Sequence, residues 1–179
     1  MADPLEIDSF DLARRAGSRE GSLEVSGLSR LADLLAQPEG QVEWRVEGRR
    51  ISRTGAPADS VLRLRMSARL HLCCGRCLGP VPIGVAAERD YLLARSEEEA
   101  ARRDDPESDF DILVGSARFD LAEWIEDELM LELPPVSFHE ACTPLSINRG
   151  LPVEAGDEVL EDRRKPFAAL ARLKVPRSG

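Results

Sequence analysis

The sequence predicts an α+β fold in which an antiparallel β-sheet or open barrel packs against a few helices. Apolar and polar residues alternate in three segments, near residues 42–47, 61–72 and 81–93, as expected for strands that bury one face. A helical apolar pattern follows these strands, over residues 120–130, instead of alternating with them. Strands that gather in hairpins and precede a helix are typical of α+β domains.

The length of 179 residues predicts one domain with tails. We expect a single α+β domain over residues 1–142, which carries a C-x-x-C turn. Residues 143–179 are expected to form a mostly extended tail. The tail ends in a short amphipathic helix over residues 165–174, with Phe167, Leu170 and Leu173 on one side.

The first elements along the chain are a helix, a strand and a loop. Leu31, Leu34 and Leu35 recur at helical spacing, so residues 29–37 are predicted to form a helix. Residues 42–47 alternate as in a half-buried strand. The sequence between the first two strands, over residues 54–60, has loop chemistry.

The clearest strand covers residues 61–72. Its even-numbered positions are all apolar, whereas its odd-numbered positions include Arg63, Arg65 and Arg69. A second alternating segment covers residues 81–93, after a turn rich in Gly and Pro. We predict that the two strands pair as an antiparallel hairpin joined by the cysteine turn.

The last part of the expected domain contains a loop, a strand and a helix. Residues 96–109 are charged and show no apolar period, so we expect a flexible acidic loop, followed by a short strand over residues 110–115. Asp120 is placed to cap a helix over residues 120–130, with Glu123 as its reciprocal partner. The residues expected on the buried stripe of this helix are Leu121, Trp124, Ile125 and Leu129.

Composition and charge limit the classes of function. The acidic amino terminus has no apolar stretch of the secretory kind, and no apolar run has the length of a membrane span, so we expect a cytoplasmic protein without a membrane partner. The formal net charge of −9 is unevenly distributed, because residues 44–76 carry +6 and residues 96–109 carry −5. A basic face can hold RNA while an acidic face holds a basic protein, since salt screens each field locally.

The cysteines admit three interpretations. Cys74 and Cys77 form a C-x-x-C motif, but a redox pair normally opens a helix, and this motif runs into a Gly- and Pro-rich turn. The two thiols could instead form a zinc site with His139 and Cys142, which provide a second pair of suitable ligands downstream. The third interpretation is that they are ordinary thiols. Cys73 is a bystander in all three cases.

Three segments together resemble one family. Residues 72–80 are similar to the C-x-R-C-L signature of the large ribosomal RNA subunit accumulation protein family (YceD). Residues 120–135 resemble its acidic helix and L-P block, His139 and Cys142 fall at its later His and Cys positions, and residues 165–174 resemble its N-P-F-A ending, with Lys165 in place of Asn. The resemblance covers residues 60–174. It implies a bacterial factor required for normal levels of large-subunit (23S) ribosomal RNA, with no catalytic residues to carry over.

Two binding hypotheses follow from the charges. An assembly factor could hold precursor large-subunit RNA with Arg63, Arg65, Arg69 and Arg76, because guanidinium groups pair with phosphates. The alternative interpretation of this arginine face is a solvated surface that only aids solubility. A protein-interaction module, stabilised by zinc, could instead hold a basic large-subunit ribosomal protein without contacting RNA. Its acidic helix would present Glu123, Glu126 and Asp127 outward.

An enzyme is the third hypothesis, and the sequence argues against it. The chain has two histidines, and it shows neither a Gly-rich phosphate loop nor a hydrolase or metalloprotease motif. We therefore expect a non-catalytic protein with no small-molecule substrate and with zinc as the one candidate cofactor.

Overall fold

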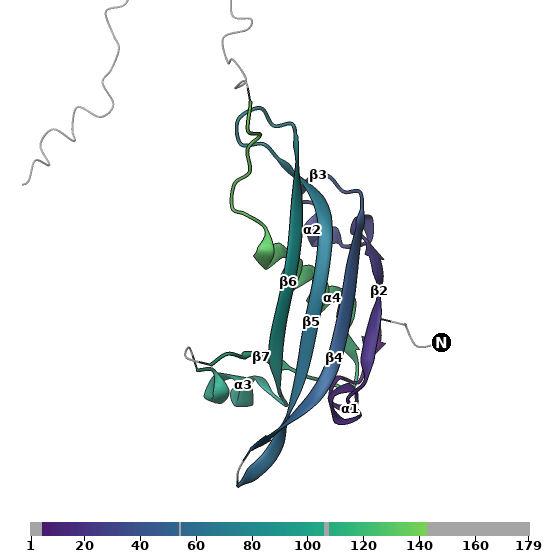
Figure 1. The fold of residues 1–179 in the computed structure, drawn as a ribbon, viewed down its shortest axis with the longest axis vertical. Coiled ribbons are helices and arrows are strands. Elements are labelled where there is room, and N and C mark those ends of the chain that lie inside the picture. The colour runs from purple at the N-terminus through teal and green to yellow at the C-terminus, as the bar shows by residue number, and fades with distance from the viewer. Residues whose placement is uncertain (1–4, 54, 106–107, 143–179) are drawn as a thin grey trace, which may run out of the picture. The chain divides into compact units, whose positions relative to one another are not determined.

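The computed structural model describes residues 5–53, 55–105 and 108–142 of the chain. The tail and the amphipathic helix expected beyond residue 142 lie outside these ranges. Three long strands dominate the described part, and they are β4 (Gln41–Arg53), β5 (Ala56–Cys73) and β6 (Pro80–Ala94). They form the middle of a six-stranded sheet (Figure 1). Five of its strands follow the order β2-β4-β5-β6-β7, and the sixth, β3, pairs with β5 off this path.

The remaining strands of this sheet are short. They are β2 (Ser18–Glu24), β7 (Asp111–Val114) and β3 (Leu35–Gln37), which pairs with the end of β5. All pairings are antiparallel except that of β6 with β7. The sheet does not close into a barrel. The fold is therefore α+β with an open sheet, which is one of the two forms that the sequence predicts.

The predicted cysteine hairpin is confirmed. β5 and β6 pair antiparallel in one continuous register from Val61↔Leu92 to Cys73↔Pro80. The even-numbered apolar residues of β5 are buried, because each second side chain points to the same face. These buried residues are Leu62, Leu64, Met66, Ala68, Leu70 and Leu72.

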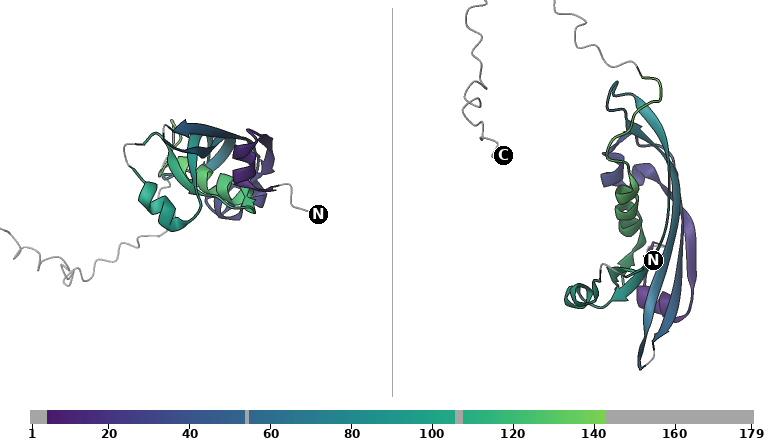
Figure 2. Two further views of the ribbon diagram at one scale, coloured as in Figure 1. Left: turned by 90° about the horizontal axis from the view of Figure 1, so that it is seen from below. Right: turned by 60° about the vertical axis from the view of Figure 1, so that its left-hand side comes forward.

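Helices cover one face of the sheet and leave the other open to solvent (Figure 2). The covering elements are α1 (Ser9–Arg14), α2 (Ser29–Ala32) and α4 (Leu121–Glu132), whose buried residues join the strand side chains in one core. Gly48 of β4 permits a close approach between helix α1 and the sheet. A Cβ at this position would lie 2.3 Å from the carbonyl oxygen of Leu12, so only glycine lets the end of α1 lie against the sheet. We call the uncovered side the outer face.

Helix α4 matches its prediction closely. The Asp120 carboxylate accepts hydrogen bonds from the backbone N–H groups of Ala122 and Glu123 at 2.8 and 3.1 Å, which satisfies two free donors of the first turn. The four predicted stripe residues are all buried. Trp124 packs edge-to-face on Tyr91 of β6, with ring centroids 5.0 Å apart, and so fixes the helix on the sheet.

Two sequence predictions near the first strands are corrected. The helix predicted over residues 29–37 ends at Ala32, and Leu35 instead enters β3 and pairs with Leu72. β4 pairs with β5 only as far as Ala68, so the last residues of β5 can pair with another strand. Pairing of Leu35 with this part of β5 outweighs the helix propensity of the segment. The loop expected over residues 54–60 is mostly strand, since β5 already begins at Ala56, after Gly55 with φ of +77°.

The acidic loop expected over residues 96–109 contains a helix, α3 (Glu97–Arg103). The hydroxyl of Ser96 accepts from Glu99 N–H at 3.3 Å, and Arg103 pairs with Asp59 of β5 at 2.6 Å. Three acids lie in its first turn and two arginines in its last, which suits the helix dipole. No residue of α3 is buried, which explains why an apolar period could not predict it.

Before residue 29, where the sequence predicts no element, the chain forms several short ones. Besides α1 and β2, these are β1 (Glu6–Ile7) and the 3₁₀ turn η1 (Val25–Gly27). β1 pairs with β8 (Phe119–Asp120), immediately before α4. Within the described ranges, no helix has the length and apolar character needed to cross a membrane.

Candidate metal centre and outer sheet face

The turn between β5 and β6 is a compact loop over residues 74–79. Cys74 closes it twice, because its N–H donates to the Gly79 carbonyl at 2.8 Å and its carbonyl accepts from Leu78 N–H at 2.9 Å. Leu78 has φ of +60°, a left-handed conformation that only tight turns usually require. The turn therefore places Cys74 and Cys77 on one side of a fixed loop.

The chain returns to this turn after α4. Ser137 forms a parallel bridge with Cys74, and its carbonyl accepts from Gly75 N–H at 2.9 Å. The Ser137 hydroxyl also donates to the Cys73 carbonyl at 3.0 Å. These bonds bring the segment with His139 and Cys142 against the cysteine turn.

Four side chains converge there, and we call them the metal cluster. One potential ligand atom from each of Cys74, Cys77, His139 and Cys142 lies within 4.8 Å of all the others. The Cys74 and Cys142 sulfurs are 3.7 Å apart, and the Cys77 sulfur is 3.5 Å from His139 Nδ1. Tetrahedral zinc with Zn–S of about 2.3 Å and Zn–N of about 2.0 Å requires edges of roughly 3.8 and 3.5 Å. The convergence predicted from the sequence is confirmed, and the cluster can hold a metal ion.

The imidazole of His139 is oriented for coordination. Its Nε2 lies 2.9 Å from the Pro80 carbonyl oxygen, which can only accept, so Nε2 carries the proton and Nδ1 faces the sulfurs. Metal-binding histidines are commonly held by such a second hydrogen bond. The contact with Pro80 raises the pKa of His139, and the neighbouring Cys74 sulfur acts in the same direction.

The thiols differ in acidity. Burial alone would raise the pKa of Cys74, but the backbone N–H groups of Cys77, Arg76 and His139 stabilise its thiolate and lower its pKa to about 5. Burial and the adjacent sulfurs raise the pKa of Cys142 to about 11. A bound metal would displace the proton of Cys142, since the thiolate is the ligand. Cys73 is exposed and lies outside the metal cluster, as expected.

Arg76, at the tip of the turn, lies over an aromatic ring. Its guanidinium carbon lies 5.0 Å from the centroid of Phe138, which remains 47% exposed. Phe138 lies directly over Gly75, where a Cβ would come within 2.8 Å of the ring. The Cys-Gly-Arg-Cys sequence therefore provides both the thiols and the space for this ring.

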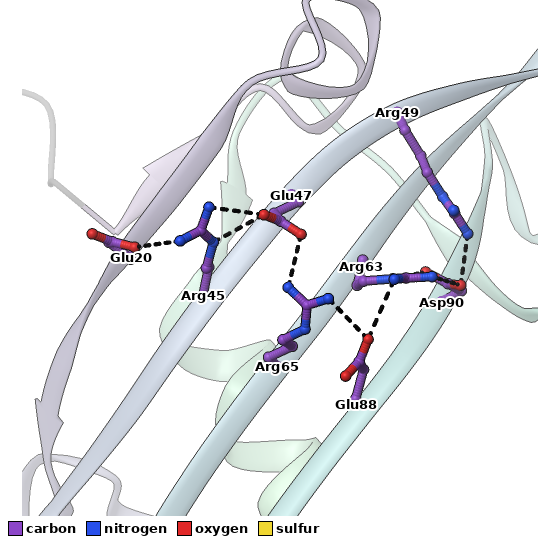
Figure 3. A network of polar contacts seen from close by, with 8 residues as sticks. All are labelled: Glu20, Arg45, Glu47, Arg49, Arg63, Arg65, Glu88 and Asp90. Carbon is purple, nitrogen blue, oxygen red and sulfur yellow. Dashed lines mark hydrogen bonds and ion pairs between the residues drawn. The ribbon is translucent and has the colours of Figure 1, made fainter.

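The middle of the outer face carries a continuous chain of ion pairs, which we call the ladder (Figure 3). It crosses strands β2, β4, β5 and β6 and alternates positive and negative groups. Four arginines meet four acids, so the ladder is neutral as a whole. Its members are Glu20, Arg45, Glu47, Arg65, Glu88, Arg63, Asp90 and Arg49.

Two of the four predicted RNA-binding arginines belong to the ladder. Arg63 makes a two-point contact with Asp90, at 2.8 and 2.7 Å, and Arg65 bridges Glu47 and Glu88 at 3.0 and 3.1 Å. The hydrogen bonds from Arg63 lower the pKa of Asp90, and those from Arg65 lower the pKa of Glu88. Both carboxylates are therefore stabilised in the charged form at neutral pH.

The other two predicted arginines lie nearer the cysteine turn. Arg69 sits opposite Gly84 in the β5–β6 register, and its nearest outer-face neighbours along β6 are Pro82 and Ala86. Within the part of the chain that the structure describes, no ion pair reaches Arg69 or Arg76. The structure thus separates the predicted arginine set into two pairs with different surroundings.

The acidic helix needs a correction. Glu126, which we expected to point outward, is buried, with 6% of its surface exposed. Its carboxylate accepts from the backbone N–H groups of Arg30 and Leu31 at 2.7 and 3.0 Å and pairs with the Arg30 guanidinium at 2.9 Å. It caps the start of α2, so it anchors α2 to α4. Glu123 and Asp127 are exposed, although Asp127 also pairs with Arg30 at 2.5 Å.

One of three comparisons with known proteins identifies a family. The model of a family described as large ribosomal RNA subunit accumulation protein YceD matches residues 62–174, more than half of the chain. The matched range contains the cysteine turn, α4 and all members of the metal cluster. No curated protein and no solved structure matches the chain.

Proposed function

The chain belongs to the YceD family of large ribosomal RNA subunit accumulation proteins, and from this premise we propose that it is a non-catalytic assembly factor that binds precursor 23S ribosomal RNA in the cytoplasm. Family membership supports the role in ribosome biogenesis. The contact with RNA is our own addition and rests on the arrangement of charge.

The observation that carries the proposal is a sheet face that is open to solvent and carries arginines along one strand. Arg63, Arg65 and Arg69 of β5 share this face, and Arg76 lies at its turn end. The opposite face is filled by the core, so binding through the sheet must use the open one. Guanidinium groups provide paired donors for phosphate and also stack on bases.

We propose zinc as the occupant of the metal cluster. Three thiolates and one imidazole are a common zinc ligand set, and the Cys74–Cys142 and Cys77–His139 distances suit a tetrahedral site. Four protein ligands would leave no open position for water or substrate, which supports a structural role and a non-catalytic protein. Zinc would hold the segment after α4 against the cysteine turn and so fix Arg76 and Phe138.

The direct test is binding of the purified full-length protein to a transcript of the large-subunit precursor. We expect binding that weakens with salt, with a slope of about −0.7 for each phosphate contacted on a single strand. A small-subunit precursor of equal length is the matched competitor. Equal affinity for both transcripts, or no salt-dependent binding to either, would contradict the proposal.

A second candidate function is binding of a basic large-subunit ribosomal protein by α4, without RNA contact. The exposed carboxylates of Glu123 and Asp127 support it, whereas the buried Glu126 supports it only indirectly, through the placement of α2. Replacing Glu123 with Lys should then abolish copurification of such a protein. It should leave the melting temperature unchanged, because the Glu123 side chain is exposed.

For Glu126, the structure predicts the opposite behaviour. Glu126→Ala removes the acceptor of two backbone N–H groups and should lower the free energy of unfolding by about 2–3 kcal/mol, whatever the partner. Glu126→Gln is the matched control, because it keeps an acceptor oxygen and loses only the charge.

If Glu123→Lys has no effect on copurification, this second candidate is wrong.

A further inference from the structure

We infer that the RNA contact is confined to the end of the outer face beside the metal cluster, which takes a single-stranded segment of RNA, while the ladder takes none. This end, which we call the knuckle half, consists of Arg69 with the adjoining part of β6, together with Arg76 and Phe138 at the turn. The inference rests on the proposed RNA binding and specifies its site.

The ladder is a poor surface for phosphate. Each of its arginines already has a carboxylate partner at 2.6–3.1 Å. Asp90 is the partner of two of them, Arg63 and Arg49. A phosphate would have to displace one of these partners and then lie beside the freed carboxylate. Like charges in contact oppose binding, so the gain from a new ion pair would be largely cancelled.

The knuckle half has no such carboxylates opposite its arginines. Arg69 faces Gly84, and a Cβ at Gly84 would have no neighbour within 4 Å, which shows open space on that side. On β6, His71 faces Pro82 and Ser67 faces Ala86, so these positions carry uncharged groups. RNA backbone can therefore approach Arg69 from the β6 side, whereas Glu43 of the outer face lies on the β4 side, opposite Ser67.

The turn adds a platform for a base. Phe138 is 47% exposed, and Leu78 is 67% exposed. The guanidinium of Arg76 lies over the Phe138 ring, 5.0 Å from its centroid, so a cation and an aromatic group are already placed side by side. Proteins bind unpaired bases on such groups, because every base has a face that stacks.

The spacing suits a short stretch of single strand. Arg69 lies four residues from the end of β5, a distance of about 13 Å along an extended strand. A segment of RNA that crosses the part of β6 next to the turn can therefore contact Arg69 with its backbone and place a base at Arg76. A basic protein partner would be repelled by these two arginines, so the charge favours RNA over the ribosomal protein.

The experiment compares two double variants of the full-length protein with equal loss of charge. Arg69→Gln with Arg76→Gln changes the knuckle half, and Arg45→Gln with Arg49→Gln changes the ladder. The probes are the large-subunit precursor transcript and a short single-stranded oligouridine. Metal content and melting temperature are measured for every variant, so that a misfolded turn is recognised.

We expect the knuckle variant to bind about tenfold or more weakly and to lose about 1.4 from the salt slope, since each single-strand phosphate contact contributes about 0.7. The ladder variant should bind within about twofold of wild type. Phe138→Ala should weaken binding of the oligouridine by about 5- to 100-fold with little change in the salt slope, because it removes stacking and no charge.

Each outcome has a distinct meaning. If the wild type fails to bind the precursor, the proposed function is wrong. If the wild type binds and the knuckle variant binds equally well, or if both double variants weaken binding to the same degree, the inference is overturned and the proposed function stands. If the knuckle variant keeps RNA binding but loses a copurifying ribosomal protein, the knuckle half is a protein contact, and the inference is again overturned.

Discussion

The two ends of the outer face differ although one strand supplies both with arginines. At the ladder, Arg63 and Arg65 meet Asp90, Glu88 and Glu47 on the neighbouring strands. In the knuckle half, Arg69 meets Gly84. The residue type and the face are the same in both places. The cross-strand neighbours differ, because Arg63 and Arg65 have charged residues opposite them on both β4 and β6, whereas Arg69 faces Gly84 on β6 and lies beyond the last β4–β5 pair. The cross-strand neighbour therefore decides whether an arginine stabilises the sheet or remains available to a ligand.

This difference also explains why the long hairpin keeps its register. A slip of one residue between β5 and β6 would move every side chain of one strand to the other face. It would bury the arginines of the ladder and separate them from their acids. The ladder thus works as a set of register contacts, whereas the turn end is held by the hydrogen bonds to Ser137.

The largest expected effect comes from the metal cluster. Cys74→Ala should abolish zinc binding and lower the free energy of unfolding by about 4 kcal/mol at a free zinc concentration of about 1,000 times Kd. The reason is that a metal bound only by the folded protein stabilises the folded form. Metal analysis and thermal melting, with and without a chelator, measure the two effects.

Cys73→Ser is the matched control for this variant. Cys73 is the adjacent residue, but it is exposed and lies outside the metal cluster, so the change should preserve metal content and melting temperature. Equal loss of metal in both variants, or wild-type metal content in Cys74→Ala, would show that the cluster is assigned wrongly. RNA binding should fall only with Cys74→Ala, because the turn carries Arg76.

The second effect separates the ladder from the knuckle half. Asp90→Ala removes the partner of Arg63 and Arg49 and should lower the free energy of unfolding by about 1–3 kcal/mol. Glu43→Ala is the control, because Glu43 lies on the same face opposite Ser67 and outside the ladder. Denaturant unfolding that gives equal stability for both variants would contradict the structural role of the ladder.

Part of the fold could be predicted from the sequence because its signals are local. Alternation along β5 and β6 and the Asp120 cap each need only neighbouring residues, and all three predictions are confirmed. The strand β3 could not be predicted in this way, because Leu35 leaves the helical pattern only to pair with Leu72, a long-range contact. Helix α3 does carry a local signal, the Ser96 and Glu99 capping pair, which an apolar period does not reveal.

The candidate site shows the same limit. The residue types of the metal cluster are distinctive, so the sequence predicted the set, although only the fold brings residue 74 beside residue 142. The ladder was missed, because alternation along β5 predicts the face of Arg63 and not its partner on β6. Glu126 was misplaced for the same reason, since its exposure depends on where α2 packs. Local patterns predict direction, and only the tertiary fold determines partners.

The third expected effect concerns pH. The pKa values of Asp90 and Glu88 are lowered in the folded protein by Arg63 and Arg65, respectively. Their contribution to stability is therefore complete above the ordinary carboxyl pKa of about 4 and is lost as the pH falls through the lowered values. The stability difference between wild type and Asp90→Ala should be constant from pH 7 to about pH 5 and should shrink below about pH 4.

Measuring a difference removes the effect of other titrating groups. Metal ligands and other carboxylates also take up protons in acid, but they do so in both proteins and cancel in the comparison. Urea unfolding at a series of pH values provides the data. A difference that stays constant down to pH 3 would mean that the ladder carboxylates are not stabilised by their arginines.

The smallest change in stability is expected for replacement of Arg69. Comparing this variant with a ladder variant tests the difference between the two ends of the outer face most directly. Arg69→Ala removes an exposed side chain with no described ion partner, so the free energy of unfolding should stay within about 0.5 kcal/mol of wild type. The salt slope for RNA binding should nevertheless fall by about 0.7–0.9, the share of one phosphate contact. Arg45→Ala, on the same face, should do the reverse. It loses ion pairs to Glu20 and Glu47, with a cost of up to about 1 kcal/mol, while the salt slope is unchanged. If the two variants instead change stability and RNA binding in parallel, cross-strand neighbours do not divide the outer face, and its arginines act as one surface.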